Sequence, residues 1–116
     1  MKIPLQVTFR DMPPSEAVEI RIRTKADKLG QFYDRIVNCR VVIEMPQRHK
    51  HQGKLHSVRI ELSVPGAELV ANHAQDEDVY VALRDAFAAI TRQLEDYVRR
   101  QRGEIKTHAS SASVLH

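Results

Sequence analysis

Apolar residues between Asp76 and Gly103 recur at the three- and four-residue spacing of one long helix. The stripe that they form consists of Val79, Leu83, Ala86, Phe87, Ile90, Leu94, Tyr97 and Val98. The segment begins with acidic residues and ends with basic ones, and glycine is common at helix ends. About 26 helical residues would extend roughly 39 Å, so the stripe needs a broad surface to cover. We therefore predict a helix that packs on a sheet.

The rest of the chain supplies that sheet. Alternating apolar and polar residues predict four strands, at residues 3–9, 35–45, 57–64 and 68–73. A second helix is predicted to begin near Ser15, just after two prolines, and to end at Gly30. Its apolar stripe consists of Val18, Ile22, Ala26 and Leu29. The Pro65–Gly66 pair predicts a tight turn between the last two strands.

This order of elements, β-α-β-β-β-α, predicts an α+β fold of two layers. The first helix should connect two parallel strands by a right-handed crossover, whereas the short later links predict antiparallel neighbours. The resulting four-stranded mixed sheet has one apolar face, and both amphipathic helices should cover it. We expect residues 1–103 to form one domain and residues 104–116 to form a short mobile tail.

The composition agrees with a single soluble domain. The 116 residues are 42% hydrophobic, and no apolar run is long enough to cross a bilayer. The N-terminus alternates like a strand and lacks the apolar centre of a signal peptide, so a cytoplasmic location is expected. The one cysteine, Cys39, excludes an internal disulfide, and the strand alternation assigns it to the buried face.

The charge is unevenly distributed along the chain. The net charge is +3, from 18 basic and 15 acidic residues. From Arg35 to Arg59 there are six basic residues and one acid, which gives +5 locally and leaves −2 for the remainder. Such a local field favours binding of a polyanion. The alternative is a solvated basic sheet edge and loop, because lysine also serves to keep sheet edges apart.

Two helical rows of cations extend this basic field. The first helix carries one row, at Arg21, Lys25 and Lys28. In the long helix, Arg99 and Arg100 can be explained by the helix dipole alone. Arg84 and Arg92 cannot, because they lie too far from the last turn. A single row is usually a solvated surface, but rows on two helices of one layer, together with a basic loop, favour phosphate binding.

The loop at residues 46–54 combines basic residues with histidines. Its cations are Arg48, Lys50 and Lys54. His49 and His51 have the spacing of a metal-binding pair, but the neighbouring cations repel a dication, so a basic finger that grips phosphates is favoured. The sequence has no paired carboxylates, serine motif or glycine-rich phosphate loop, so no enzyme activity, cofactor, metal or small-molecule substrate is predicted.

Four segments of the chain carry a family resemblance. They are SEA at 15–17, KLGQFYDRI at 28–36, DVYVAL at 78–83 and RQL at 92–94. Together with the order of elements, they make about residues 1–108 similar to the bacterial ribosome hibernation-promoting factors, ribosome-associated inhibitors and sigma-factor modulation proteins. The similarity is to the short form of the family, which lacks the C-terminal dimerisation domain of the long form.

The resemblance implies a fold like that of double-stranded-RNA-binding domains. It also implies binding to the small ribosomal subunit at the decoding region, through rRNA and neighbouring ribosomal proteins. There a bound member sterically blocks tRNA and mRNA, which silences translation in stationary phase or under stress. A member of this kind is expected to be monomeric when free and to need no membrane. The short, non-acidic tail favours members that promote ribosome pairing over members that block it.

The cations expected to bind rRNA come from both helical rows and from the loop. They are Arg21, Lys25, Lys28, Arg48, Lys50, Lys54, Arg84, Arg92, Arg99 and Arg100. Two other functions stay open from the sequence. One is a generic double-stranded-RNA-binding module, and the other is a protein-interaction module that modulates a transcription factor.

Overall fold

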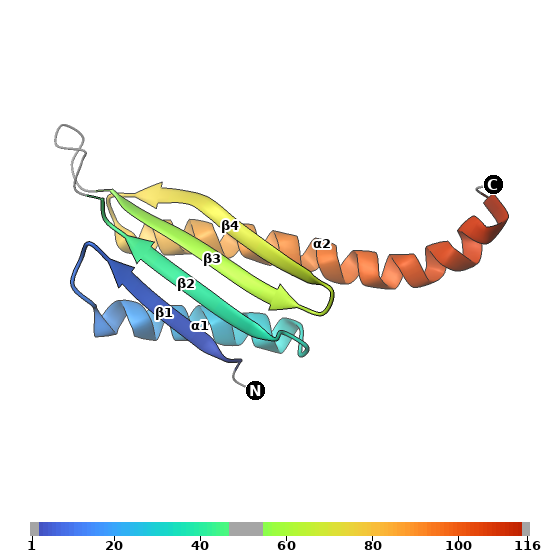
Figure 1. Ribbon diagram of the computed structural model, residues 1–116, viewed down its shortest axis with the longest axis horizontal. Coiled ribbons are helices and arrows are strands. Elements are labelled where there is room, and N and C mark those ends of the chain that lie inside the picture. Colours follow the sequence, from blue (N-terminus) through green and yellow to red (C-terminus); the bar gives the residue numbers. More distant parts are fainter. Residues whose placement is uncertain (1–2, 47–54, 115–116) are drawn as a thin grey trace.

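The computed structural model describes residues 3–46 and 55–114, with side chains as far as Gly103. It contains a four-stranded sheet whose one face is covered by two helices (Figure 1). The elements are β1 (Leu5–Arg10), α1 (Glu16–Phe32), β2 (Asn38–Glu44), β3 (His56–Val64), β4 (Ala67–Asp76) and α2 (Val79–Val114). The predicted element order and two-layer α+β class are therefore confirmed.

The sheet has the strand order β1-β2-β3-β4. β1 and β2 are parallel, with Val7 paired to Val41, and α1 forms the crossover between them. β2, β3 and β4 follow as an antiparallel meander. The turn between β3 and β4 contains Gly66 at a φ of 79°, a left-handed conformation that glycine adopts without strain. The mixed sheet thus has the connections that the sequence predicts.

The core lies between the apolar face of the sheet and the two helices. Every second residue of the central strands is buried, namely Cys39, Val41 and Ile43 in β2 and Val58, Ile60, Leu62 and Val64 in β3. From the helices, Ile22, Leu83 and Ile90 are among the fully buried side chains. No polar or charged residue of the described chain is buried. The described cations of both helices are therefore not part of the core.

Side-chain caps begin both helices. The Ser15 hydroxyl accepts a hydrogen bond from the Val18 amide at 3.3 Å, which places the start of α1 as predicted. The Asp78 carboxylate accepts from the Tyr80 amide at 2.8 Å, so α2 begins at Val79 and not at Asp76. β4 itself extends to Asp76, because its pairing with β3 continues to that residue and does not stop at residue 73.

The two helix ends predicted at glycines are wrong. α1 includes Gly30, which is buried, and ends at Phe32, where the Tyr33 amide donates to the Leu29 carbonyl at 3.0 Å. α2 passes through Gly103 and continues to Val114, over 36 residues. Neither glycine has a positive φ. A glycine inside a helix costs only about 1 kcal/mol, which the surrounding helix can offset.

At 36 residues, α2 is long enough for its apolar character to be compared with that of a membrane-spanning helix. Within the described residues, no helix combines the length and the apolar character that crossing a membrane would require.

Candidate nucleic-acid interface

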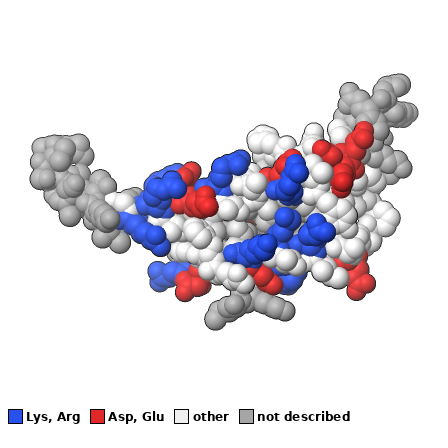
Figure 2. All heavy atoms as spheres, turned by 180° about the vertical axis from the view of Figure 1, so that it is seen from behind, with Lys and Arg blue, Asp and Glu red and all other residues white. Residues whose placement is uncertain are grey.

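A cationic groove runs between α1 and α2 on the outside of the helical layer. Lys25 and Lys28 line it from α1, and Arg84 and Arg92 line it from α2. The groove has a volume of about 550 Å³, and Glu95 is its one acidic lining residue among those described. Figure 2 views the molecule from this side and shows Lys and Arg gathered over its surface. The groove therefore offers a concentrated positive charge to a ligand.

The sequence spacing of α1 explains one side of this groove. Arg21, Lys25 and Lys28 are separated by four and three residues, so they share one flank of the helix. The neighbouring flank is the buried stripe that contains Ile22 and Leu29. Because the buried stripe faces the sheet, the cationic flank is left at the boundary with α2. The cationic flank of α1 therefore forms one side of the groove between the two helices.

The pKa of Lys25 reflects this crowding of cations. Partial burial lowers the pKa below the ordinary lysine value of 10.5, and the positive charges of Lys28, Arg21 and Arg84 lower it further. Arg84 belongs to the other helix, so the two rows are close enough to repel each other. The free protein therefore holds like charges together, and a bound anion would relieve their repulsion.

Aromatic and acidic neighbours hold two of the arginines. The Arg21 guanidinium lies over the Tyr80 ring, 4.8 Å from its centroid, a cation–π contact between α1 and α2. Arg84 donates to the Asp85 carboxylate from two nitrogens, at 3.1 and 3.2 Å. That ion pair is exposed, and exposed pairs contribute at most about 1 kcal/mol. Arg84 can therefore exchange this partner for a phosphate at little cost.

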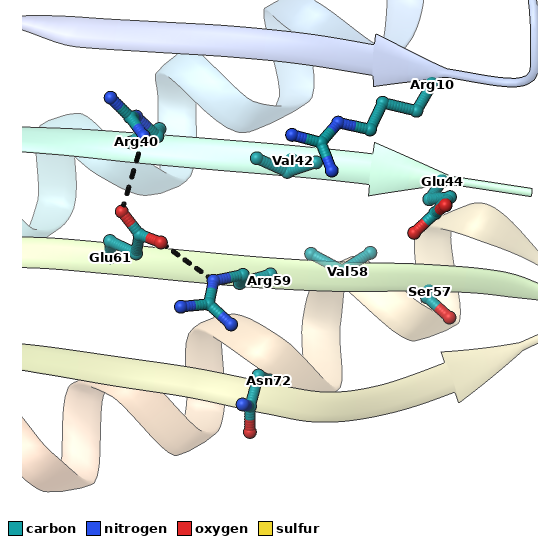
Figure 3. Close-up of a pocket in the computed structure, with 9 residues that line it drawn as sticks. All are labelled: Arg10, Arg40, Val42, Glu44, Ser57, Val58, Arg59, Glu61 and Asn72. Atoms are coloured by element: carbon teal, nitrogen blue, oxygen red, sulfur yellow. Dashed lines mark hydrogen bonds and ion pairs between the residues drawn. The ribbon is translucent and has the colours of Figure 1, made fainter.

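The open face of the sheet carries a second group of charges. A shallow hollow of about 490 Å³ on this face contains Arg10, Arg40 and Arg59. Figure 3 shows Glu61 between two of them, with its carboxylate 3.7 Å from Arg40 and 2.7 Å from Arg59. Glu44 adds another acid to the same hollow. Acids thus neutralise more of the positive charge here than in the helical groove, so the groove keeps the larger excess of positive charge.

The described side chains were also compared with the requirements of a metal site and of a reactive cysteine. Among the described residues, no three metal-ligating side chains come together. Cys39 is 1% exposed, and burial raises the pKa of its thiol to about 12, so it is the buried small residue that the sequence predicts.

Comparison with known protein families identifies the chain. Residues 5–102 match the family model described as sigma 54 modulation protein / S30EA ribosomal protein. The chain belongs to this family. The match covers every described strand and most of α2, so it includes both sides of the groove. A comparison with curated protein sequences gave no significant match.

Solved structures support the fold of this S30EA-family chain. A ribosomal subunit interface protein from Coxiella burnetii is 19% identical, with a TM-score of 0.70 over 82% of this chain and 97% of that one. The N-terminal domain of Protein Y from Thermus thermophilus is 18% identical, with a TM-score of 0.68 over 84% of this chain and 99% of that one. At this level of identity the likeness establishes a shared fold.

The structure brings together some of the predicted site residues of this family member. The cations that meet at the groove are Arg21, Lys25, Lys28, Arg84 and Arg92. Arg99 lines an adjoining hollow and donates to Asp96 at 2.9 Å. Arg100 is exposed, but it lies about 160° around α2 from Arg84 and is therefore directed away from the groove. Arg48, Lys50 and Lys54 lie outside the described residues.

Two residues at this site were missed from the sequence. Phe32 is 51% exposed and lines the groove as well as two hollows beside it. Arg102 lines both of those hollows. Phe32 follows Lys28 by four residues, so it continues the row of cations and does not belong to the apolar stripe. That position was the available signal, because an aromatic residue on a charged flank is not needed for the core.

Proposed function

We propose that this protein binds the small ribosomal subunit at the decoding region and blocks tRNA and mRNA, silencing translation under stress or in stationary phase. The observation that carries the proposal is the convergence of two cation rows on one groove, in a chain of the S30EA ribosomal protein family. The ion pair of Arg84 with Asp85 is exposed, so a phosphate can replace Asp85, and a bound phosphate would relieve the repulsion between Lys25 and its neighbouring cations.

The proposed mechanism is steric and needs no catalytic group. Phosphate contacts position a protein on nucleic acid without reading its sequence. Lys25, Lys28 and Arg84 would therefore orient the helical layer against the rRNA backbone. The thickness of the two layers would then exclude other ligands from the same space. Specificity for the decoding region would come from the fit between the folded rRNA and the groove.

Two charge-matched variants test which face binds. The groove variant carries Lys28→Gln, Arg84→Gln and Arg92→Gln. The sheet variant carries Arg10→Gln, Arg40→Gln and Arg59→Gln, and it loses the same net charge. We expect co-sedimentation with small subunits to weaken strongly in the groove variant and only slightly in the sheet variant. A stronger loss in the sheet variant would place the contact on the open face of the sheet.

Salt dependence tests the electrostatic part of the proposal. If about six phosphates are neutralised, log affinity should fall against log salt with a slope of about −4 to −5. The groove variant should lose about 2 to 3 of that slope, since three contacts are removed. Deacylated tRNA should compete with the wild-type protein for the small subunit. A slope near zero, or simultaneous binding with tRNA, would refute the proposed mechanism.

A further inference from the structure

Phe32 is an exposed aromatic residue at the end of α1. The large apolar side chains that the described chain exposes are Ile20, Phe32 and Val37, and Phe32 is the aromatic one among them. It contributes to three adjoining hollows along the boundary between α1 and α2. A half-exposed ring is common on protein surfaces, and what distinguishes Phe32 is that cations line the same hollows.

Cations lie on both sides of Phe32 along the groove. Towards the middle of the helices, the groove that it lines contains Lys25, Lys28, Arg84 and Arg92. Towards the C-terminal side, Arg99 and Arg102 line the hollow that also contains Val98. The ring therefore forms an apolar surface between two groups of positive charges. This arrangement suits a ligand that carries negative charge at two places and a flat apolar group between them.

We infer that Phe32 is a stacking platform for an unpaired nucleotide of RNA. The base would lie on the phenyl ring, and the phosphates on its two sides would lie against the two groups of cations. Stacking on aromatic side chains is a general way in which proteins hold unpaired bases. This inference rests on the proposed function, because it concerns how the same groove holds rRNA. It adds a contact to a base where the cations alone contact only phosphates.

Glu95 gives the site a preference among bases. Glu95 lines the groove and also the hollow on the C-terminal side, so its carboxylate is within reach of the position of the stacked base. A carboxylate repels phosphate but accepts a hydrogen bond from an exocyclic amino group. Adenine, cytosine and guanine carry such a group, and uracil does not. Uracil could donate only from its ring N3–H, so the platform should favour bases that carry an amino group.

Fluorescence of the purified full chain tests stacking directly. The chain has no tryptophan, so Phe32→Trp introduces a single indole at the platform. We expect single-stranded oligoadenylate to quench the indole emission more strongly than oligouridylate of the same length. Inorganic polyphosphate is the control, because it supplies the charge without bases and should displace the RNA without quenching. Absence of quenching by oligoadenylate, or equal quenching by polyphosphate, would overturn the inference.

Ribosome binding separates this inference from the proposed function. Phe32→Leu keeps an apolar side chain and removes the ring, and it should weaken small-subunit binding roughly 5- to 150-fold without changing the salt slope. Phe32→Tyr should restore binding. Ile20→Ala, on another face of the same helix, is the matched control and should bind as the wild type does. Thermal unfolding of each variant identifies any loss of binding that comes from loss of the fold.

Each alternative has its own outcome. If the wild type does not bind small subunits, the proposed function fails, while the oligonucleotide experiment still tests Phe32. If Phe32→Leu binds as tightly as the wild type, the platform is wrong and the proposed function stands. If Phe32→Leu weakens subunit binding but no RNA quenches Phe32→Trp, the ring contacts a ribosomal protein. If the wild type self-associates in sedimentation and Phe32→Leu does not, the ring contacts a second copy of the chain. Either of these last two results overturns the inference.

Discussion

Replacing Lys25 with glutamine should stabilise the free protein and weaken its binding to the ribosome. The opposite signs follow from the position of Lys25, which is partly buried and faces Lys28, Arg21 and Arg84. Glutamine is neutral, so it removes the desolvation of a charge and three like-charge repulsions. The same charge that destabilises the free fold would contact a phosphate in the complex.

The gain in stability can be estimated from these three repulsions. A like-charge pair on a helix surface costs about 0.2–0.5 kcal/mol. After allowance for solvent screening, the sum is about 0.5–1 kcal/mol in the free energy of unfolding. For a domain of about 100 residues this corresponds to a rise in Tm of roughly 2–8 °C. One lost phosphate contact should reduce the salt slope of ribosome binding by about 0.7–0.9.

The stability difference should also depend on pH. The folded state lowers the pKa of Lys25, so between that pKa and 10.5 the unfolded state binds more protons and stability of the wild type rises with pH. The repulsion is fully present below the lowered pKa and vanishes once lysine is neutral in both states. The advantage of Lys25→Gln should therefore shrink as pH rises through the lowered pKa towards 10.5.

Thermal unfolding and co-sedimentation on the same preparations check this prediction. Arg100→Gln is the matched control, because it removes one positive charge from an exposed position on the other flank of α2. We expect the control to leave Tm nearly unchanged and to reduce binding less. A lower Tm for Lys25→Gln would mean that lysine packing outweighs the repulsion. Unchanged ribosome binding would mean that Lys25 does not contact rRNA, and would refute the reasoning from the groove.

Three further predictions concern single features of the chain. Cys39 should react with a thiol reagent only as the protein unfolds, because its thiol is buried and its pKa is raised to about 12; rapid reaction of the native protein, followed by absorbance, would contradict this burial. Gly103→Ala should increase the helical circular-dichroism signal and stabilise α2 by about 0.5–1 kcal/mol, since no described atom outside the neighbouring helix backbone lies within 4 Å of the added methyl group. A decrease would indicate that the helix ends at Gly103 in solution. Replacing Arg48, Lys50 and Lys54 together with alanine should leave Tm unchanged and weaken ribosome binding, whereas a large fall in Tm would assign the loop a structural role.

The strands and the layer arrangement were predictable because their signals are repeated. In β2 and β3 every second residue is apolar, and a shift by one position would expose the whole buried set. The stripe of α2 from Leu83 to Val98 repeats over several turns in the same way. Each pattern is supported by many residues, so a local exception does not change the result.

Helix ends were less predictable because each rests on one or two residues. Gly30 and Gly103 are of the residue type that commonly ends a helix, yet both lie inside helices. Whether a helix stops at a glycine depends on the conformation of that residue, and only a left-handed glycine provides the usual cap. The sequence contains the residue type but not its φ. The predicted start of α2 at Asp76 was too early, because strand pairing between β3 and β4 continues to that residue and no local pattern shows where it stops.

The candidate site was predictable in part. The spacing of Arg21, Lys25 and Lys28 is a local helical signal and could be read directly. The meeting of this row with Arg84 depends on how the two helices pack, which no local pattern contains. Phe32 was overlooked because the predicted helix ended at Gly30, whereas α1 continues to Phe32 and so extends the row of Lys25 and Lys28 to this residue.

The two sides of the groove are separated in the chain by the rest of the sheet. α1 ends at Phe32 and α2 begins at Val79, so three strands must be in place before the two cation rows meet. A partly folded or proteolysed copy would present one row alone, with the weak and unselective attraction of any basic helix. Competence to bind is thus a property of the finished fold. Such coupling would give the cell a check that only intact copies reach the ribosome.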